Sequence, residues 1–325
     1  MTDTPPIRGN RALKVVSVIN FKGGVSKTTL SFHLACFLAR NSRVLLIDVD
    51  HQSSLSIVIL RGAAWQARAA ANATVNHIFL SYTSRRIQSP GRSIIVQNPM
   101  QRGQSNLYPQ LDLVPAQFEL DDTEIDLAST TTGVPALSDW EKRTLLADWL
   151  DDIGAESSYD YVIFDCPPAT KIVSQNALAC SHGYIVPVIP DELSSRGVTH
   201  FSSLVDRKID QKLDSLRVSA QVPPNEVPRA YASTTKMVGI VPSLIKSAGG
   251  AASGMTNIHT EQLAALRSQW GPAVINTVGK HYIGIPEALN AGLPVWNHWG
   301  SNAGRLQKAM MTNICTELKT RIDAL

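Results

Sequence analysis

Residues 18–34 read VINFKGGVSKTTLSFHL, and this stretch decides the fold expected of the chain. A β-branched run ends at Ile19, glycines follow at positions 23 and 24, and a helical pattern begins near Lys27. A strand, a glycine-bearing loop and a helix in this order direct free backbone N–H groups at an anion. The usual phosphate-binding pattern is G-x-x-x-x-G-K-[ST], and here Phe21 and Ser26 replace both of its glycines. The stretch therefore predicts a phosphate site of an unusual subtype.

The residues of this loop have different expected tasks. Gly23 and Gly24 let the backbone approach phosphates closely. Lys27 is placed to reach the β and γ phosphates, and the Thr28 hydroxyl is placed to bind Mg²⁺. Ser26 directly precedes the helix, where a serine hydroxyl often caps a free N–H, although a left-handed backbone there would cost about 1 kcal/mol. The alternative is a lysine-flanked turn before a core helix.

Short apolar runs along the chain predict a buried parallel sheet. These runs lack polar faces, as strands covered by helices on both sides do. The expected strands are 15–19, 44–47, 93–97, 111–114, 161–164, 184–189 and 237–241. The expected helices are 27–40, 140–153, 173–180 and 306–325. This alternation predicts the α/β class, with a doubly wound, mostly parallel sheet and helices on both faces.

The domain organisation expected from composition is simple. A flexible tail at residues 1–13 precedes a single domain at 14–325, with insertions around 61–139 and surface loops at 219–230 and 247–254. Of the 325 residues, 44% are hydrophobic and 18% are charged, as in ordinary globular proteins. No stretch approaches the roughly 18 apolar residues that cross a bilayer, so stable membrane insertion is not expected. The C-terminal helix is expected to pack on the fold, the alternative being a membrane-surface helix.

The remaining chemistry excludes several classes of protein. Four separated cysteines and eight histidines show no metal-ligand spacing, which fits structural thiols in a reducing cytosol. Neither G-x-S-x-G nor G-x-G-x-x-G occurs, which argues against an α/β-hydrolase and a dinucleotide oxidoreductase. The net charge of +3 permits a polyanionic partner without requiring one.

Carboxylates follow two of the expected strands. RVLLIDVDHQSS ends a strand at Asp48 and Asp50, and YDYVIFDCPPAT ends another at Asp165. Ligands of open α/β sheets bind at the carboxyl ends of the strands. A carboxylate there can hold the hydration shell of Mg²⁺ or orient an attacking water.

Three motifs now resemble a known family. KGGVSKTT, LLIDVDHQSS and VIFDCPPAT are similar to the deviant Walker A, Walker A′ and Walker B motifs of the ParA/MinD family of P-loop ATPases. NALACSHGYIVPVIPDELSSRGV and IPEALNAGLPVW resemble stretches of its ParA partition branch, so the similarity runs from about Lys14 to the C-terminus. The resemblance implies ATP and Mg²⁺ as cofactors. It implies nucleotide contacts from Lys22, Gly23, Gly24, Val25, Ser26, Lys27, Thr28 and Thr29.

The resemblance also implies roles for individual side chains. Lys22 matches the signature lysine that reaches the partner's phosphates in an ATP sandwich dimer, and Lys27 matches the P-loop lysine. Asp50 matches the switch I aspartate that positions the hydrolytic water, which gives Lys22, Lys27 and Asp50 as catalytic residues. Thr28, Asp48 and Asp165 are the expected metal-site residues. For Asp48, a carboxylate that caps the next turn is the alternative.

The family resemblance implies a cytoplasmic ATPase with weak hydrolysis that forms a homodimer in the ATP state. It also implies association with the nucleoid through non-specific binding of double-stranded DNA. A ParB-like or other small partner protein is expected to stimulate hydrolysis. The candidate DNA contacts are Arg196, Arg207, Lys208, Lys212, Arg305, Lys308, Lys319 and Arg321. The alternatives are an ATP-dependent switch or scaffold that recruits a partner to a membrane or defence complex, and a fold member that binds no nucleotide.

Three departures from the family pattern affect these expectations. Ser26 replaces the usual glycine, and His51 replaces the proline common after Asp50, which is expected to loosen switch I. GIVPSLIKSAGG replaces the segment that often helps to bind the base. The adenine contacts are therefore left open.

Overall fold

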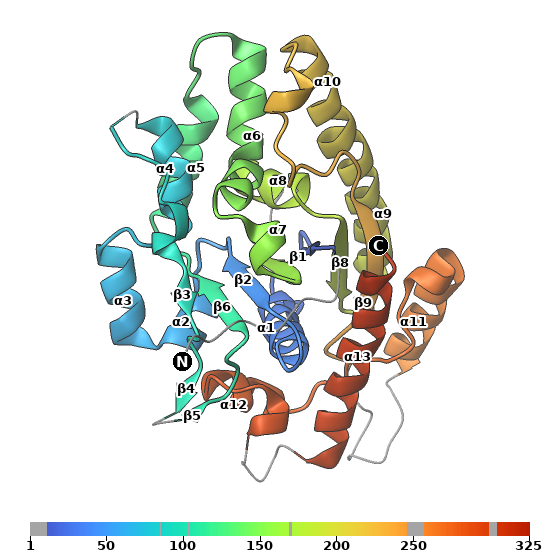
Figure 1. Ribbon diagram of the computed structural model, residues 1–325. Helices are drawn as coiled ribbons and strands as arrows, with labels where there is room; N and C mark the ends of the chain where they lie inside the picture. The colour runs from blue at the N-terminus through green and yellow to red at the C-terminus, as the bar shows by residue number, and fades with distance from the viewer. Residues whose placement is uncertain (1–11, 85, 103–104, 169–170, 246–256, 299–303) are drawn as a thin grey trace.

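A seven-stranded sheet forms the centre of the molecule (Figure 1). The computed structural model describes residues 12–84, 86–102, 105–168, 171–245, 257–298 and 304–325. The strand order is β3-β6-β2-β7-β1-β8-β9, and all neighbours are parallel except the antiparallel pair β3 and β6. The strands are β1 Lys14–Val18, β2 Val44–Asp48, β3 Val96–Gln97, β6 Leu111–Val114, β7 Tyr161–Asp165, β8 Gly183–Val188 and β9 Lys236–Pro242. The α/β class and the mostly parallel sheet are confirmed.

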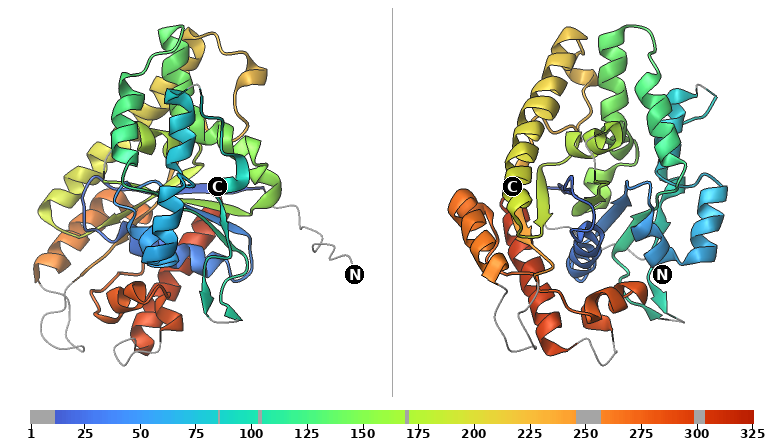
Figure 2. Two further views of the ribbon diagram at one scale, coloured as in Figure 1. Left: turned by 90° about the vertical axis from the view of Figure 1, so that its left-hand side faces the viewer. Right: turned by 180° about the vertical axis from the view of Figure 1, so that it is seen from behind.

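Helices cover both faces of this sheet (Figure 2). One hydrophobic core lies under α4, α5, α6, α8 and α9, and a second lies under α1, α2, α12 and α13. The helices are α1 Lys27–Leu38, α2 Ser54–Leu60, α3 Gly62–Ala70, α4 Asn76–Thr83, α5 Leu120–Ser129, α6 Pro135–Asp152, α7 Ala155–Ser158, α8 Ile172–Ala179, α9 Glu192–Leu204, α10 Gln211–Ser219, α11 Asn257–Trp270, α12 Gly284–Asn290 and α13 Arg305–Asp323. A small hairpin of β4 Gln101–Arg102 and β5 Ser105–Asn106 stands apart from the sheet.

Strand β1 contributes side chains to both hydrophobic cores. Val15 enters the core under α6, whereas Val16 and Val18 enter the core under α1, because successive side chains of a strand alternate between faces. Ser17 is fully buried, and its hydroxyl forms a 2.8 Å hydrogen bond with the hydroxyl of Ser181. A polar residue in the central strand is thus satisfied without water.

The expected elements agree with the structure except in detail. The strand expected at 93–97 is wrong over its first half, because residues 91–94 form a 3₁₀ turn that the Ser93 hydroxyl closes by donating to the Pro90 carbonyl at 2.7 Å. Helix α6 begins at Pro135, five positions before the expected start, with proline in the first turn where its missing N–H is harmless. Residues 1–11 of the expected tail and the expected loop at 247–254 lie outside the described residues.

The C-terminal helix α13 packs against the fold, as expected. Met311, Ile314, Leu318 and Ile322 on α13 are buried, although Leu306 at its start is 67% exposed. All four cysteines are free and buried, and burial raises the pKa of each thiol. No described helix has the length and apolar content needed to span a bilayer.

A π-helical segment at Val205–Asp210 joins α9 to α10. At its end the Asp210 carboxylate accepts hydrogen bonds from the Thr235 backbone N–H at 3.0 Å and from the Thr235 hydroxyl at 3.3 Å. Because Thr235 directly precedes β9, this carboxylate ties the long helix to the edge of the sheet.

Candidate functional site

The loop between β1 and α1 opens toward a cavity. Gly24 has φ +72°, a conformation that only glycine adopts without strain. A Cβ added to Gly23 or Gly24 would meet no atom within 4 Å, so the backbone of both residues can be approached closely. The Phe21 ring packs on the Phe201 ring with centroids 5.1 Å apart, which anchors the loop to α9.

Ser26 stands at the N-cap of α1, but its expected capping role is wrong. Its hydroxyl makes no hydrogen bond to the helix N-terminus, and its backbone is left-handed with φ 69° and ψ 27°. The usual glycine of the loop would adopt this conformation freely, whereas serine is strained by about 1 kcal/mol. The Ser26 carbonyl still accepts from the Leu30 N–H at 3.0 Å, so α1 starts normally.

The two loop lysines have different environments. Lys27 is buried, and its ammonium donates to the Lys22 carbonyl at 3.2 Å. Burial lowers the pKa of Lys27, while the charges of Asp165 and Asp50 oppose that shift. Lys22 is 44% exposed, and its ammonium pairs with the carboxylate of Asp191, just before α9. Lys27 is thus fixed within the loop, whereas Lys22 is paired with a carboxylate that is distant in the sequence.

Asp48 ends β2 and is completely buried. One carboxylate oxygen accepts from the Asp50 N–H at 3.1 Å, and the other accepts from the Ser56 N–H at 3.0 Å and the Ser56 hydroxyl at 2.6 Å. Burial raises the pKa of Asp48, and Asp165 raises it further. This geometry favours the turn-capping alternative, since Asp48 organises the start of α2; a role in the Mg²⁺ shell stays a prediction.

Asp165 ends β7 in register with Asp48 but has fewer partners. Its Oδ1 accepts from the Ser31 hydroxyl at 2.9 Å, whereas its buried Oδ2 has no hydrogen-bond partner. Burial raises the pKa of Asp165, and the hydroxyls of Thr28 and Ser31 act in the opposite direction. An unsatisfied buried carboxylate oxygen beside a threonine hydroxyl fits a hydrated Mg²⁺, because hard cations prefer oxygen ligands.

Asp50 lies at the mouth of the cavity in a closed turn. Its side chain is 13% exposed, and one carboxylate oxygen accepts from the Gln52 N–H at 2.9 Å. The Ser53 N–H donates to the Asp50 carbonyl at 2.8 Å, and the Ser53 hydroxyl donates to the His51 carbonyl at 3.3 Å. The segment expected to be loosened by His51 is therefore a hydrogen-bonded turn here.

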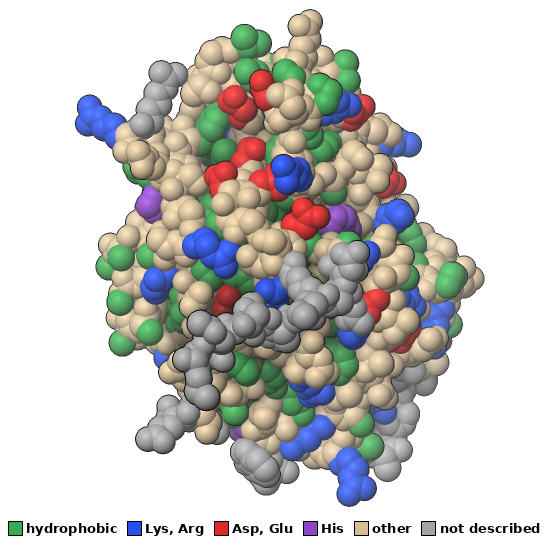
Figure 3. Space-filling model, in the orientation of Figure 1, with side chains coloured by type: hydrophobic (Ala, Val, Ile, Leu, Met, Phe, Trp, Pro, Cys, Tyr) green, Lys and Arg blue, Asp and Glu red, His purple; other side chains and the backbone are tan. Residues whose placement is uncertain are grey.

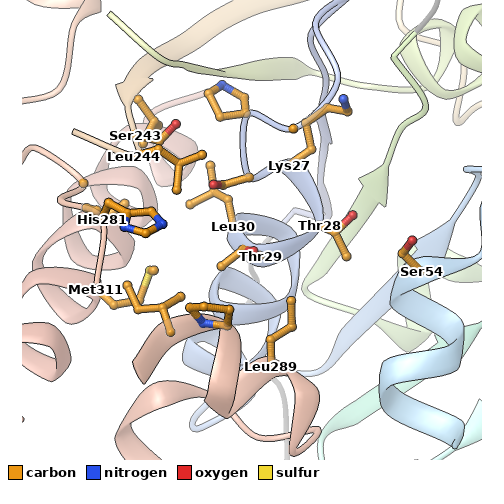
Figure 4. A pocket seen from close by; sticks show the side chains of 18 of the residues that line it. Lys27, Thr28, Thr29, Leu30, Ser54, Ser243, Leu244, His281, Leu289 and Met311 are labelled. Carbon is orange, nitrogen blue, oxygen red and sulfur yellow. The ribbon is translucent and has the colours of Figure 1, made fainter. Parts of the chain in front are cut away.

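The cavity has a volume of about 550 Å³ and extends beyond the phosphate loop. Figure 4 shows Ser54 of α2 on one side of the first turns of α1, His281 and Met311 on the other side, and Leu289 of α12 below α1 between them. Ser243 and Leu244, from the segment whose base contacts were left open, also border the cavity. The Ser243 hydroxyl lies 3.1 Å from the Val25 carbonyl, which joins that segment to the phosphate loop.

Several of these residues were not predicted from the sequence. Ser31 and Ser56 lie outside the quoted motifs, and Asp191 lies in the quoted ParA-like stretch without a predicted role. The contacts of Ser31 and Asp191 are with residues distant in the chain. The sequence also did not predict that apolar residues from the C-terminal part of the chain line the cavity. The only sequence signal for these apolar residues was the quoted IPEALNAGLPVW stretch, which holds the cavity residues Ile285, Pro286 and Leu289.

Known proteins share this chain's sequence pattern. The profile of the AAA domain family matches residues 13–218, which is more than half of the chain. The chain belongs to this family. The chromosome partitioning protein ParA of Caulobacter vibrioides is 29% identical over 196 residues, covering 60% of this chain and 63% of its own length. The sporulation initiation inhibitor protein Soj of Bacillus subtilis is 29% identical over 195 residues, covering 59% and 64%.

Solved structures support the same fold at lower identity. Apo McdA from Cyanothece has a TM-score of 0.64 at 17% identity, covering 95% of this chain and 99% of that one. A putative plasmid partition protein from Borrelia burgdorferi, bound to AMPPNP, has a TM-score of 0.59 at 16% identity, covering 94% and 99%. These solved structures show the fold alone. The AAA domain profile, the ParA and Soj relatives and the three motifs together identify a ParA-type P-loop ATPase.

Among the described basic residues predicted to contact DNA, those near α9 and those at the start of α13 lie on different parts of the molecule. Arg207 is exposed between α9 and α10, whereas Arg305 is exposed at the start of α13, at the lower end of the molecule in Figure 1. The side chains of Arg196 and Lys208 lie outside the described residues. On the face drawn in Figure 3, most acidic side chains lie over the upper half, interspersed with Lys and Arg, and the charged side chains at the lower end are Lys and Arg.

Some of these basic side chains have partners within the protein. Arg321 pairs with Glu317 at 3.0 Å and donates to the Val238 and Ala273 carbonyls at 3.3 and 3.2 Å. Lys319 pairs with Asp323 in the next turn of α13, and burial lowers the pKa of Lys212. The contacts of Arg321 favour a role in holding α13 to β9. For the others, DNA contact stays a prediction.

Proposed function

We propose that this chain binds ATP with Mg²⁺ in the cavity and that the bound nucleotide drives formation of a sandwich homodimer. The proposal is carried by the presence of two buried groups at the phosphate loop. These are the Lys27 ammonium and the Asp165 Oδ2 atom, which has no hydrogen-bond partner. Lys27 and the loop N–H groups would bind the phosphates. Asp165 and Thr28 would hold the Mg²⁺, which neutralises phosphate charge when bound.

Lys22 would act in the partner's site. In the monomer its ammonium pairs with Asp191, so dimer formation exchanges this carboxylate for the phosphates bound by the partner. A cation supplied in trans stabilises the charge that develops on the transferred phosphoryl group. Asp50, at the mouth of the cavity, would orient the attacking water, and Ser54 starts the helix that follows its turn.

The ATP dimer would bind double-stranded DNA non-specifically and associate with the nucleoid from the cytoplasm. A ParB-like or other small partner would stimulate slow hydrolysis and release the dimer, as part of positioning a plasmid, a chromosome or a protein assembly. Membership of the ParA-type family supports this cycle, since the C. vibrioides relative is a chromosome partitioning protein. DNA contact through lysine and arginine predicts a steep fall in affinity with salt.

The decisive experiment is the Lys22→Ala variant in size-exclusion chromatography with and without ATP and Mg²⁺. The variant is expected to keep ATP binding, as seen in a thermal shift, and to lose the ATP-dependent dimer. Lys236→Ala, which removes another exposed lysine far from the loop, is the matched control and should dimerise normally. Normal dimerisation of Lys22→Ala would show that the role in trans is wrong.

A second experiment separates DNA positioning from a switch or scaffold function. ATP-dependent retention on DNA at low salt, lost at high salt, supports the partition-type cycle. Binding to liposomes without DNA retention would instead support the switch or scaffold. The absence of any thermal shift with ATP and Mg²⁺ would contradict both.

A further inference from the structure

Residues 284–297, here called the α12 wall, contribute Ile285, Pro286 and Leu289 to the lining of the cavity. The α12 wall consists of α12, the turn after it and a 3₁₀ turn at Val295–Asn297. Ile285 and Leu289 of this wall border the cavity, and Ser54 and Val58 of α2 border it from another side. The α12 wall and α2 therefore border the same cavity.

Arg61 makes that connection. It lies between α2 and α3 with φ 68° and ψ 157°, a backbone conformation that is essentially restricted to glycine. Its guanidinium Nη1 donates to the Asn290 carbonyl, the last of α12, at 2.7 Å. The chain thus places an arginine where glycine would be unstrained, and this arginine joins the end of α2 to the end of α12.

The turn after α12 is shaped around this arginine. Gly292 has φ +61°, and a Cβ added there would lie 2.7 Å from Arg61 Nη2 and 2.8 Å from the Val58 carbonyl. Contacts that short are not tolerated, so only glycine fits beside Arg61 and the last turn of α2. The close fit from both sides indicates a specific junction and not a chance surface contact.

His33 fixes the other end of the wall. It is completely buried, and its pKa is lowered to about 4 by burial, so the ring is neutral. Its Nδ1–H donates to the Thr29 carbonyl at 2.7 Å, and its Nε2 accepts from the Val295 N–H at 3.0 Å. Thr29 borders the cavity, so the wall is attached to the phosphate-loop helix as well as to α2.

We propose that Arg61 is a positioning residue that couples the α12 wall to α2, so that the wall is held over the cavity when bound nucleotide fixes α2. The start of α2 is attached to the strand-end carboxylate Asp48 through Ser56, and Arg61 carries that attachment from the far end of α2 to the wall. This inference rests on the proposed ATP binding. It gives Arg61, a residue outside the nucleotide motifs, a role in the response of the α12 wall to bound nucleotide.

The test measures amide hydrogen exchange of residues 284–297 in the wild-type protein and in Arg61→Ala. ATP with Mg²⁺ should slow exchange in the wild type, and Arg61→Ala should reduce that protection by about tenfold, as expected for loss of a charge-assisted hydrogen bond. Without nucleotide, the variant should already exchange faster across α12. Arg68→Ala is the matched control, because Arg68 of α3 also donates to a backbone carbonyl, that of Ser93 at 3.1 Å, which lies outside the α12 wall.

Two further variants separate coupling from stability. Arg61→Gly removes the guanidinium and the backbone strain, so it should unfold at a higher temperature than Arg61→Ala yet lose the same protection of the wall. Gly292→Ala keeps Arg61, but the added methyl group would clash with its guanidinium. This variant should also lose the ATP-dependent protection of the α12 wall from hydrogen exchange. If Arg61→Ala only lowers the unfolding temperature and the wall responds to ATP as in the wild type, the inference is overturned.

The outcome also distinguishes this inference from the proposed function. A wild-type protein that shows no thermal shift with ATP and Mg²⁺ would overturn the proposed ATP binding. Normal ATP binding without any slowing of exchange at 284–297 would overturn the coupling alone. Unchanged exchange across α12 in nucleotide-free Arg61→Ala would show that Arg61 does not position the wall.

Discussion

Strands β2 and β7 end side by side in two aspartates that differ in what surrounds them. Asp48 and Asp165 occupy paired positions, are buried alike, and have pKa values raised by that burial. Asp48 accepts three hydrogen bonds from its own chain, whereas one oxygen of Asp165 has no partner. The neighbours of a carboxylate, and not its place at the sheet edge, thus decide whether it organises the fold or remains available to a ligand.

The largest expected effect that would sharpen this contrast is on ligand binding in Asp165→Asn. Loss of the charge facing the metal position should weaken Mg²⁺-dependent ATP affinity by about a hundredfold or more, roughly 3 kcal/mol. The nucleotide-free variant should unfold at a higher temperature, because a buried carboxyl group whose pKa is raised by burial is replaced by a neutral amide. Calorimetric titration with and without EDTA measures the first effect and a thermal scan the second. Asp122→Asn, at an exposed position of α5, should change neither.

The next effect concerns Asp48→Asn and should appear in stability. An amide has a single acceptor atom, so its oxygen can face either the two Ser56 donors or the Asp50 N–H, and at least one N–H loses its acceptor. We expect the free energy of unfolding to fall by about 2 kcal/mol, measured by urea denaturation, with ATP affinity changed less than in Asp165→Asn. Equal loss of Mg²⁺-dependent binding in both variants would break the contrast.

A smaller effect is expected in the loop between these strand ends. Ser26→Gly removes left-handed strain without removing a hydrogen bond, so the free energy of unfolding should rise by about 1 kcal/mol. ATP affinity should stay within about tenfold, roughly 1.4 kcal/mol. A larger loss of affinity in a nucleotide titration would mean that the serine hydroxyl itself contacts the nucleotide.

The smallest effect tests a third carboxylate, Asp210, far from the cavity. Burial raises its pKa to about 6, Thr235 opposes the shift through its hydrogen bonds, and Asp206 adds to it. A raised carboxyl pKa contributes stability that is complete below about pH 4 and lost as the pH rises through about 6. Asp210→Asn should therefore match the wild type at pH 4 and exceed it at pH 8, by less than about 1 kcal/mol because the site is partly solvated. Thermal scans at the two pH values measure this difference.

Local patterns predicted the parts of the molecule that local contacts determine. The run from β1 through the loop to α1 and the short central strands were found, because backbone geometry and apolar periodicity are written in neighbouring residues. Asp165 was predicted by its place at a strand end. The start of α6 was missed because Pro135 acts as a first-turn residue, which becomes visible only once the helix is known.

Long-range contacts explain what the sequence did not predict. Lys22 pairs with Asp191 across 169 positions, and His33 binds the Val295 N–H across 262 positions. The capping role expected for Ser26 was wrong: its backbone in the phosphate loop is left-handed, and its hydroxyl makes no hydrogen bond to the helix N-terminus. Arg61 carries no motif, and its role depends on a glycine far along the chain.

The four buried cysteines have a practical consequence for spectroscopy. Their thiols have raised pKa values and no access to solvent, so maleimide reagents should not modify them in the native protein. A single cysteine introduced at Ile283, which is 65% exposed just before α12, would then carry a fluorophore in an otherwise unaltered chain. Fluorescence from the labelled variant would therefore report on the α12 wall in solution, without labelling of the native cysteines.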